Sequence, residues 1–291
     1  DEVGSRGLGD VYKRQAKVAR ERERRMRVFR AVSKSLQPVS QLVRAKGPAH
    51  IRDMVQPMHV ALIAAVVLGV GAPDADLALD LACGLANTGD VPVSGWWMPA
   101  ESPATGDIRR LDHDAWHDRL EATIRWQAAK PESGAEQVLL YEQTQQEVAR
   151  GIMHGPFSRA QLDECYGPSR WRAMRRFGVL QKVKVRCCDN ARTSEHNDCV
   201  HRHEKVAGES ADFPARASGG FADEYGEPVP MESGNDDLKD AYRHSPTGEP
   251  EWSVVAQAAP SGGVEYFTMP GFNFGVSSAV PQFNRTPELS V

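Results

Sequence analysis

Cysteine is scarce in this chain, and its positions follow no recognisable spacing. Among the 291 residues there are five cysteines: Cys83, Cys165, Cys187, Cys188 and Cys199. An odd and irregular set, with no signal peptide before it, does not predict a disulfide framework. We therefore expect free thiols and a reducing intracellular compartment, cytoplasmic or nuclear.

Long hydrophobic runs are also missing. The longest one, from His59 to Gly71, has two glycines near its end and is shorter than the roughly 20 residues that a membrane helix needs. It is typical of a buried core helix, so no membrane partner is expected. The sequence also lacks a phosphate-binding loop ending in Gly-Lys-Ser or Gly-Lys-Thr, a nucleophile elbow and any internal repeat.

The net charge of −4 hides an uneven distribution. Between Lys13 and Arg30 there are nine basic side chains and only two acidic ones. The spacing of the apolar residues predicts an amphipathic basic helix from Lys17 to Leu36, ended by Pro38. Such a helix is more often a solvated surface than a contact for nucleic acid.

The N-terminal half is predicted to be mostly helical. Residues 1–15 are polar and glycine-containing, and we interpret them as a non-native segment derived from a linker. Further helices are predicted over about 48–68, 74–86 and 112–129, with a linker or strap after residue 87. These elements define a helical N-terminal region over residues 16–130. The missing initial methionine and an expected helix at the other end suggest a fragment at both ends.

Residues 131–291 show a different pattern, which makes the predicted fold class α+β. A helix is expected over 137–150, and Ser158 is expected to cap the next one. The alternation of apolar and basic residues over 175–188 predicts a two-stranded antiparallel element with a basic face. Residues 205–234 are rich in Gly, Ser, Pro and acids and are predicted to form a long exposed loop.

Two short segments near the C-terminus carry the chemistry. Asp237-Leu238-Lys239-Asp240-Ala241-Tyr242 indicates a strand that delivers a carboxylate, followed by a turn with an aromatic residue. Phe274-Gly275-Val276-Ser277-Ser278-Ala279 indicates a glycine loop that enters a helix. Nucleotidyl transfer needs an acid for a divalent metal and a backbone position without a side chain where the nucleotide approaches.

In this order, and together with the basic strand pair, the segments resemble a reverse transcriptase of a retrotransposon. The resemblance covers about residues 151–291 and implies an incomplete fingers and palm. It implies that Asp237 is the catalytic carboxylate and binds Mg²⁺. The residues that it assigns to the nucleotide are Lys184, Arg186, Asp240, Ala241, Tyr242, Phe274 and Gly275.

The resemblance also implies a role for each of these residues. The two basic side chains would contact the triphosphate, because fixed cations stabilise the charge that a leaving pyrophosphate gains. Asp240 and Ala241 would offer backbone amides, and Tyr242 would exclude the 2′-hydroxyl of a ribonucleotide. Phe274 and Gly275 would pack on the nucleotide and the template base. The implied partners are an RNA template, a DNA primer and deoxynucleotides.

The chain departs from the family pattern at several points. Asn190 stands where many relatives have a second acid, and Val280 stands where proline is common. The aromatic-x-Asp-Asp block that supplies further metal ligands does not follow before Val291. The resemblance therefore implies that this chain by itself is inactive as a polymerase. The sequence makes no prediction of the oligomeric state.

Two other functions are compatible with the sequence. One is a non-catalytic nucleic-acid-binding protein that uses the basic N-terminal helix and the paired strands. The other is a zinc module, because thiols and imidazoles gather in a short window: Cys187, Cys188, His196, Cys199, His201 and His203. Strand alternation directs Cys187 and Cys188 to opposite faces, so a strand core beside a histidine-rich loop is the commoner outcome.

Overall fold

The computed structural model describes residues 2–130, 134–181, 184–207 and 240–288. It is a mixed α and β fold with its strands in two mixed sheets, as the sequence predicted for the fold class. The α-helices are α1 (Glu2–Lys46), α2 (Arg52–Val55), α3 (Val60–Val70), α4 (Leu77–Cys83), α5 (His113–Ala128), α6 (Gly134–Ala149), α7 (Arg159–Tyr166) and α9 (Ala279–Glu288). The 3₁₀ turns are η1 (Ala49–Ile51), η2 (Ile108–Arg110), η4 (Asn197–Cys199), η5 (Ala241–His244) and η6 (Pro250–Trp252).

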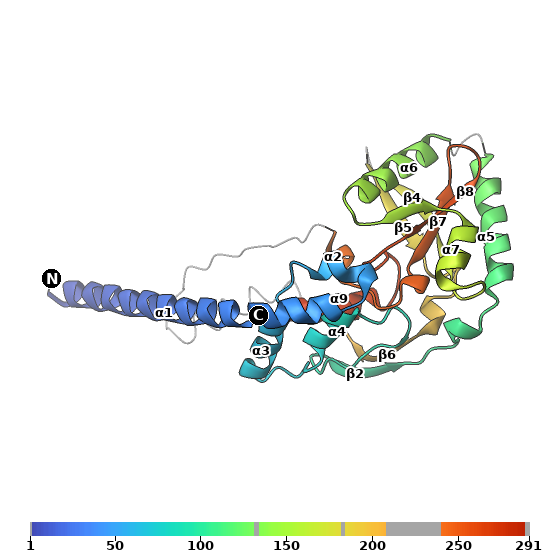
Figure 1. The fold of residues 1–291 in the computed structure, drawn as a ribbon. Coiled ribbons are helices and arrows are strands. Elements are labelled where there is room, and N and C mark those ends of the chain that lie inside the picture. The colour runs from blue at the N-terminus through green and yellow to red at the C-terminus, as the bar shows by residue number, and fades with distance from the viewer. Residues whose placement is uncertain (1, 131–133, 182–183, 208–239, 289–291) are drawn as a thin grey trace.

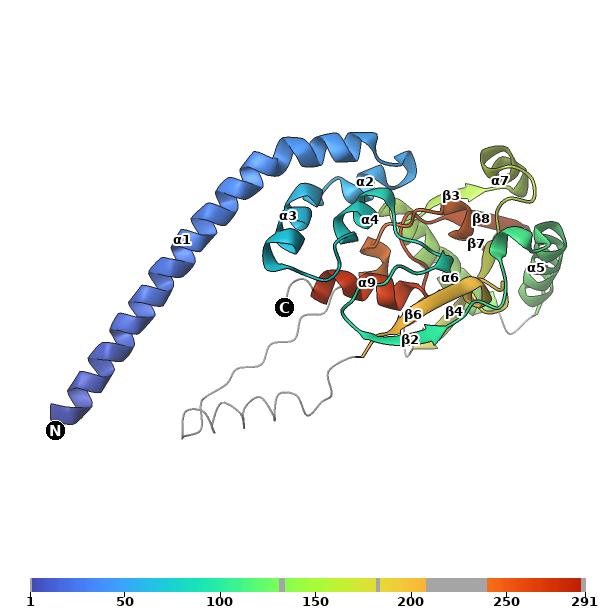
Figure 2. The same cartoon turned by 90° about the horizontal axis from the view of Figure 1, so that it is seen from below.

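Helix α1 is longer than the sequence predicted, and the prediction that Pro38 ends it is wrong. The missing N–H of Pro38 removes one helical hydrogen bond, yet the helix continues because the next turns pack against α3. Ser40 is fully buried there, and Val43 packs on the cluster around Ile51. The helix bends in its C-terminal part (Figure 2), while its N-terminal part projects away from the body (Figure 1).

The predicted helix over 48–68 is divided into two pieces. Gln56 still has helical geometry as the C-cap of α2, but Pro57 has no N–H to continue the helical hydrogen bonds, so the chain breaks there. The His59 side chain then accepts a hydrogen bond from the Leu62 amide and begins α3. In the described residues no single helix has the length and apolarity to cross a membrane; η1–α2 and α3 pass that test only as a pair, bent by 70°.

The larger sheet has five strands in the order β3-β8-β7-β4-β5. Their bounds are β3 (His154–Phe157), β4 (Ala173–Gln181), β5 (Lys184–Asn190), β7 (Val254–Ala258) and β8 (Val264–Thr268). β4 and β5 form the predicted antiparallel pair, in register from Arg175↔Asn190 to Gln181↔Lys184. β4 and β7 are parallel, which brings the region after residue 240 beside the strand pair.

Helices α5, α6 and α7 cover the five-stranded sheet (Figures 1 and 2). Trp116 of α5 and Trp171 pack with Tyr266 of β8 in the main core. The Asp112 side chain caps α5, and Ser158 caps α7 in a capping box with Gln161, as their sequences predict.

The segment expected to be a linker or strap instead contains two strands, β1 (Gly89–Asp90) and β2 (Met98–Ser102). Both pair with β6 (Val200–Lys205) in a three-stranded sheet of order β1-β6-β2. β1 runs parallel to β6, and β2 runs antiparallel to it. The sequence did not predict these strands, because their partner lies about a hundred residues away.

The first and last parts of the described chain share a core. Leu77 and Leu81 of α4 pack with Phe272 and Ala279. Arg285 of α9 donates from Nε and Nη2 to the Asp74 carboxylate at 2.7 Å each. The predicted boundary at residue 130 stays a prediction, but residues on both sides of it are packed together.

Candidate functional site

Several parts of the chain line one cavity of about 1040 Å³. They include β5 with the turn after it, the segment around η5 and the loop before α9, and residues of α6, β4 and η4 complete the wall. Six residues that the sequence singled out lie in its wall: Arg186, Asp240, Ala241, Tyr242, Phe274 and Gly275. The cavity therefore brings together residues that up to 89 positions separate.

Two predicted residues cannot be placed in this wall. Asp237, the predicted catalytic and metal-binding carboxylate, lies outside the described residues, as does most of the predicted loop over 205–234. Lys184 begins β5 and pairs with Gln181, and the structure describes its backbone only.

Four buried, charged side chains form ion pairs beside the cavity. Asp189 of β5 lies 3.2 Å from Arg176 of β4 and 3.4 Å from Arg243 of η5. Arg176 also pairs with Glu147 of α6 at 2.5 Å. These four side chains contain two positive and two negative charges, so the group is neutral as a whole. Because each is nearly or fully buried, removal of one would leave an uncompensated charge in the interior.

The pKa values of the two arginines respond differently to this environment. Burial alone lowers the pKa of Arg176, but the carboxylates of Asp189 and Glu147 outweigh it, and the pKa is raised. For Arg243 burial dominates, and its pKa is lowered from the ordinary arginine value. An arginine pKa lies so far above neutrality that both guanidinium groups remain charged.

The glycine loop lies directly against β5. Gly275 has a φ of +115°, and a Cβ on it would lie 2.3 Å from the Asp189 carbonyl oxygen. The Asp189 amide in turn donates to the Phe274 carbonyl at 3.0 Å. A side chain at position 275 is excluded by both the backbone conformation and this contact.

Asn197 holds the same loop from the other side. Its Nδ2 donates to the Gly275 carbonyl at 3.0 Å, and its Oδ1 accepts from the Ser277 amide at 2.8 Å. One side chain therefore satisfies two backbone groups just before α9.

Aromatic side chains form another part of the wall. Tyr242 meets Phe274 edge to face at 5.7 Å between ring centroids, and meets Phe283 of α9 in the same way at 5.4 Å. The guanidinium of Arg243 lies over the Phe274 ring at 4.7 Å. Tyr242 is thus held between the glycine loop and α9, with its position set by packing.

Positive charge is exposed at the cavity. Arg186 and Arg192 both line it and are exposed to solvent. Asp240, in the left-handed conformation at φ +60°, pairs with Arg150. Cations in a cavity wall raise the local concentration of anionic ligands such as phosphates.

The described carboxylates of the cavity do not suit Mg²⁺. Asp189 and Glu147 are paired with buried guanidinium groups, and Asp240 is paired with Arg150. Mg²⁺ prefers carboxylate oxygens that are not already neutralised. A magnesium site here would depend on Asp237, which is outside the described residues.

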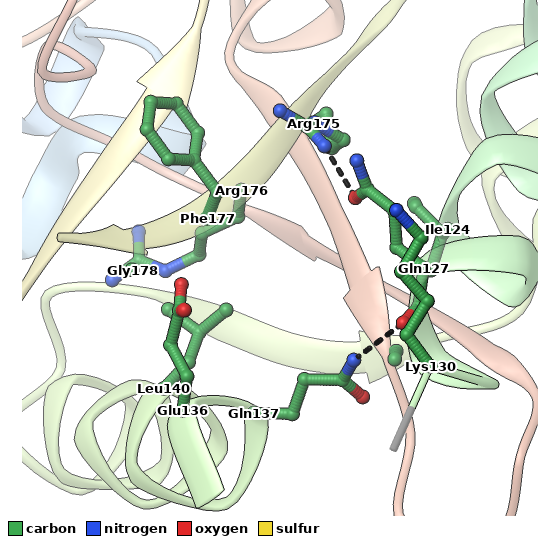
Figure 3. Close-up of a pocket in the computed structure, with 11 residues that line it drawn as sticks. Ile124, Gln127, Lys130, Glu136, Gln137, Leu140, Arg175, Arg176, Phe177 and Gly178 are labelled. Atoms are coloured by element: carbon green, nitrogen blue, oxygen red, sulfur yellow. Dashed lines mark hydrogen bonds between the residues drawn. The ribbon is translucent and has the colours of Figure 1, made fainter. Parts of the chain in front are cut away.

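A smaller cavity of about 360 Å³ lies between α5, α6 and β4 (Figure 3). Arg175 points toward Gln127 and donates to its side-chain oxygen, and Gln137 donates to the Gln127 carbonyl at 3.3 Å. No residue that the sequence assigned to a nucleotide lies in its wall. This cavity is a gap between packed elements, lined by both polar and apolar side chains.

The six predicted zinc ligands do not form one cluster. Cys187 and Cys199 are buried, and burial raises the pKa of the Cys199 thiol to about 11. His196 is buried against Ser194, and burial lowers its pKa to about 3. Over the described parts of the chain, one group of potential metal ligands is found: Asp90, His201 and His203.

Comparison with known proteins does not assign the chain. No protein-family model matches it, and a search of curated proteins found no significant match.

Sequence reasoning missed the buried arginines. Arg176 and Arg243 look like ordinary surface charges, and nothing in their spacing indicates that they share Asp189. The one feature of the sequence that could have pointed to Arg243 as part of the site is its position directly after Tyr242.

Proposed function

We propose that the large cavity binds a deoxynucleoside triphosphate, and that the chain is part of an RNA-directed DNA polymerase of a retrotransposon. The observation that carries this proposal is the convergence of Arg186, Tyr242 and Gly275 on one cavity wall. Each comes from a different block of the resemblance, and the blocks are far apart in sequence.

The wall offers chemistry that suits this ligand. Exposed Arg186 and Arg192 would contact the phosphates through charge-assisted hydrogen bonds. The Phe274–Gly275 backbone would lie beneath the base, and it can lie this close to β5 because Gly275 has no Cβ to meet the Asp189 carbonyl. The Tyr242 ring would lie near the sugar and disfavour a 2′-hydroxyl. The activity that we propose for these residues is nucleotide binding.

The test is the affinity of the full chain for a deoxynucleoside triphosphate with Mg²⁺, measured by calorimetry. Arg186→Ala should weaken binding about tenfold or more, because a charge-assisted contact is lost. The matched control is Arg22→Ala, which removes an exposed arginine of α1 far from the cavity wall. Equal affinities for the Arg186 variant and the control would refute the proposed cavity.

In this proposal Asp237 is the Mg²⁺ ligand. Asp237→Asn should remove the Mg²⁺ dependence of nucleotide binding and leave the fold unchanged. A variant that responds to Mg²⁺ as the wild type does would exclude Asp237 as the ligand. This result would be independent of the Arg186 measurement.

A second candidate function is non-catalytic binding of an RNA template or RNA–DNA duplex through α1. Its basic stretch is exposed and projects from the body (Figure 1). Arg22→Glu with Arg27→Glu should then weaken binding to an RNA–DNA duplex and reduce its salt dependence. Nucleotide affinity should not change, which separates the two candidates. Either function belongs in the cytoplasm or nucleus.

A further inference from the structure

The three-stranded sheet carries a group of four side chains that no proposed activity uses. His201 and His203 are two residues apart on β6, so their side chains share one face of the strand. β1 pairs with β6 in the register Asp90↔His201. On the other side, the pairing of β2 with β6 shifts between Pro99 and Ser102, and Glu101 lies within this irregularity.

The donor atoms of this group are already close to one another. His201 lies 2.8 Å from Asp90 through Nδ1 and 2.8 Å from Glu101 through Nε2. His203 lies 3.1 Å from Glu101 through Nδ1 and 3.6 Å from Asp90 through Nε2. One donor atom from each of Asp90, His201 and His203 lies within 4.8 Å of the other two.

Asp90 and Glu101 face opposite nitrogens of each imidazole, so in these positions one ion can share both rings with only one of the two acids. On the Asp90 side the ligand atoms are Asp90 Oδ1, His201 Nδ1 and His203 Nε2. With bonds of about 2.0–2.2 Å, the ligand atoms of a tetrahedral zinc ion lie about 3.3 Å apart. Both imidazoles are about one-third exposed, at 29%, and the Asp90 carboxylate is 78% exposed. Asp90 can therefore turn toward an ion without movement of the strands, and the ion can enter from solvent.

The composition of the group selects the kind of metal. Two imidazoles and the Asp90 carboxylate supply nitrogen and oxygen donors, which match a borderline divalent ion. Glu101 would hold both imidazoles through their second nitrogens, as carboxylates commonly do for zinc-bound histidines. Magnesium and calcium prefer oxygen ligands alone. The neighbouring backbone is also held in place, because Glu204 accepts from the amides of Ser94 and Gly95 at 2.8 and 2.7 Å just before β2.

We propose that Asp90, His201 and His203 bind zinc, and that Glu101 orients both imidazoles through their other nitrogens, so that the site joins β1 and β2 across β6. The site is distinct from the set of cysteines and histidines that the sequence suggested, since only His201 and His203 are common to both. It does not depend on the proposed nucleotide cavity. Zinc bound here would stabilise the segment over 87–102, whose two short strands have few other partners in the described structure.

The first test is a zinc titration of the full chain, freed of metal by a chelator, in competition with a chromogenic indicator. We expect one zinc per chain. His203→Gln should lower the affinity at least about tenfold, because one imidazole ligand is lost. Asp90→Asn is a second variant. Its side chain is 78% exposed, so the exchange should leave the fold intact and lower only the zinc affinity. His154→Gln, at an exposed histidine of β3, is the matched control and should bind like the wild type.

The second test replaces zinc with cobalt and records its visible spectrum. A site of two imidazoles, one carboxylate and a water molecule should show tetrahedral cobalt bands without a thiolate charge-transfer band. A thiolate band that disappears in Cys199→Ser would overturn the proposal in favour of a cysteine site. It would also be overturned by no binding, by one metal per two chains, or by equal affinity in His203→Gln and His154→Gln.

Discussion

Asp189 and Arg243 are separated by 54 positions in the chain, yet their buried side chains lie 3.4 Å apart beneath the large cavity. The second carboxylate oxygen of Asp189 faces Arg176 at 3.2 Å. This shared acid joins the β4–β5 pair to η5, where Arg243 lies over the Phe274 ring of the glycine loop. The wall of the candidate site is therefore held by an interior ion network.

We predict that Asp189→Ala destabilises the protein by about 3–5 kcal/mol, because two buried guanidinium groups lose their common carboxylate. The free energy of unfolding from urea titration measures this. Glu142→Ala, an exposed acid on α6, should change it by about 0.5 kcal/mol or less. Similar losses of unfolding free energy in both variants would mean that the buried ion network stabilises the protein no more than one exposed acid does.

Gly275→Ala should destabilise the protein by about 1–3 kcal/mol, because alanine is strained at φ +115° and its Cβ would meet the Asp189 carbonyl. Nucleotide affinity should fall as well, since the loop must shift. Gly69→Ala in α3 is the matched control: a Cβ there meets nothing within 4 Å, and alanine favours a helix by about 1 kcal/mol. The measurement is the thermal unfolding of both variants. A Gly275→Ala variant as stable as Gly69→Ala would contradict the predicted destabilisation.

Tyr242→Val should reduce the preference for deoxynucleotides over ribonucleotides, because the proposed steric barrier at the sugar is lost. Tyr242→Phe keeps the ring and its contacts with Phe274 and Phe283, so it should keep the preference. The measurement is the ratio of the two dissociation constants in each variant. An unchanged ratio in Tyr242→Val would exclude the sugar-selecting role and leave the cavity assignment to the Arg186 test.

Stability should fall as the pH drops below about 6.5, the usual histidine pKa in an unfolded chain. Burial lowers the pKa of His117 and of His196 to about 3, so the unfolded state binds these protons first. Each histidine then removes up to about 1.4 kcal/mol per pH unit between pH 6.5 and 3.

Urea titrations at several pH values test this dependence. His117→Gln should make the slope between pH 4 and 6 shallower by close to one proton, and His154→Gln, at an exposed position, should not change it. Glutamine can still accept from the Ala173 amide, which bonds to His117 Nε2 at 3.4 Å. Identical slopes in the wild type and His117→Gln would show that His117 titrates normally.

Local features were predictable from the sequence because they depend on residues a few positions apart. The cap of α5 at Asp112, the cap of α7 at Ser158 and the β4–β5 pair follow from such short-range patterns. The end expected at Pro38 was wrong for a long-range reason, since burial of Ser40 against α3 outweighs a missing hydrogen bond.

The sequence by itself determined the mixed fold class and the strand pair, and it singled out six of the residues that line the cavity. Only the tertiary structure decided that Arg186, Tyr242 and Gly275 share one cavity, that Asp189 serves two buried arginines, and that Asp90 faces His201. The physical reason is that periodicity and capping act within a few residues. Strand pairing and burial of charge instead join positions that no local pattern relates.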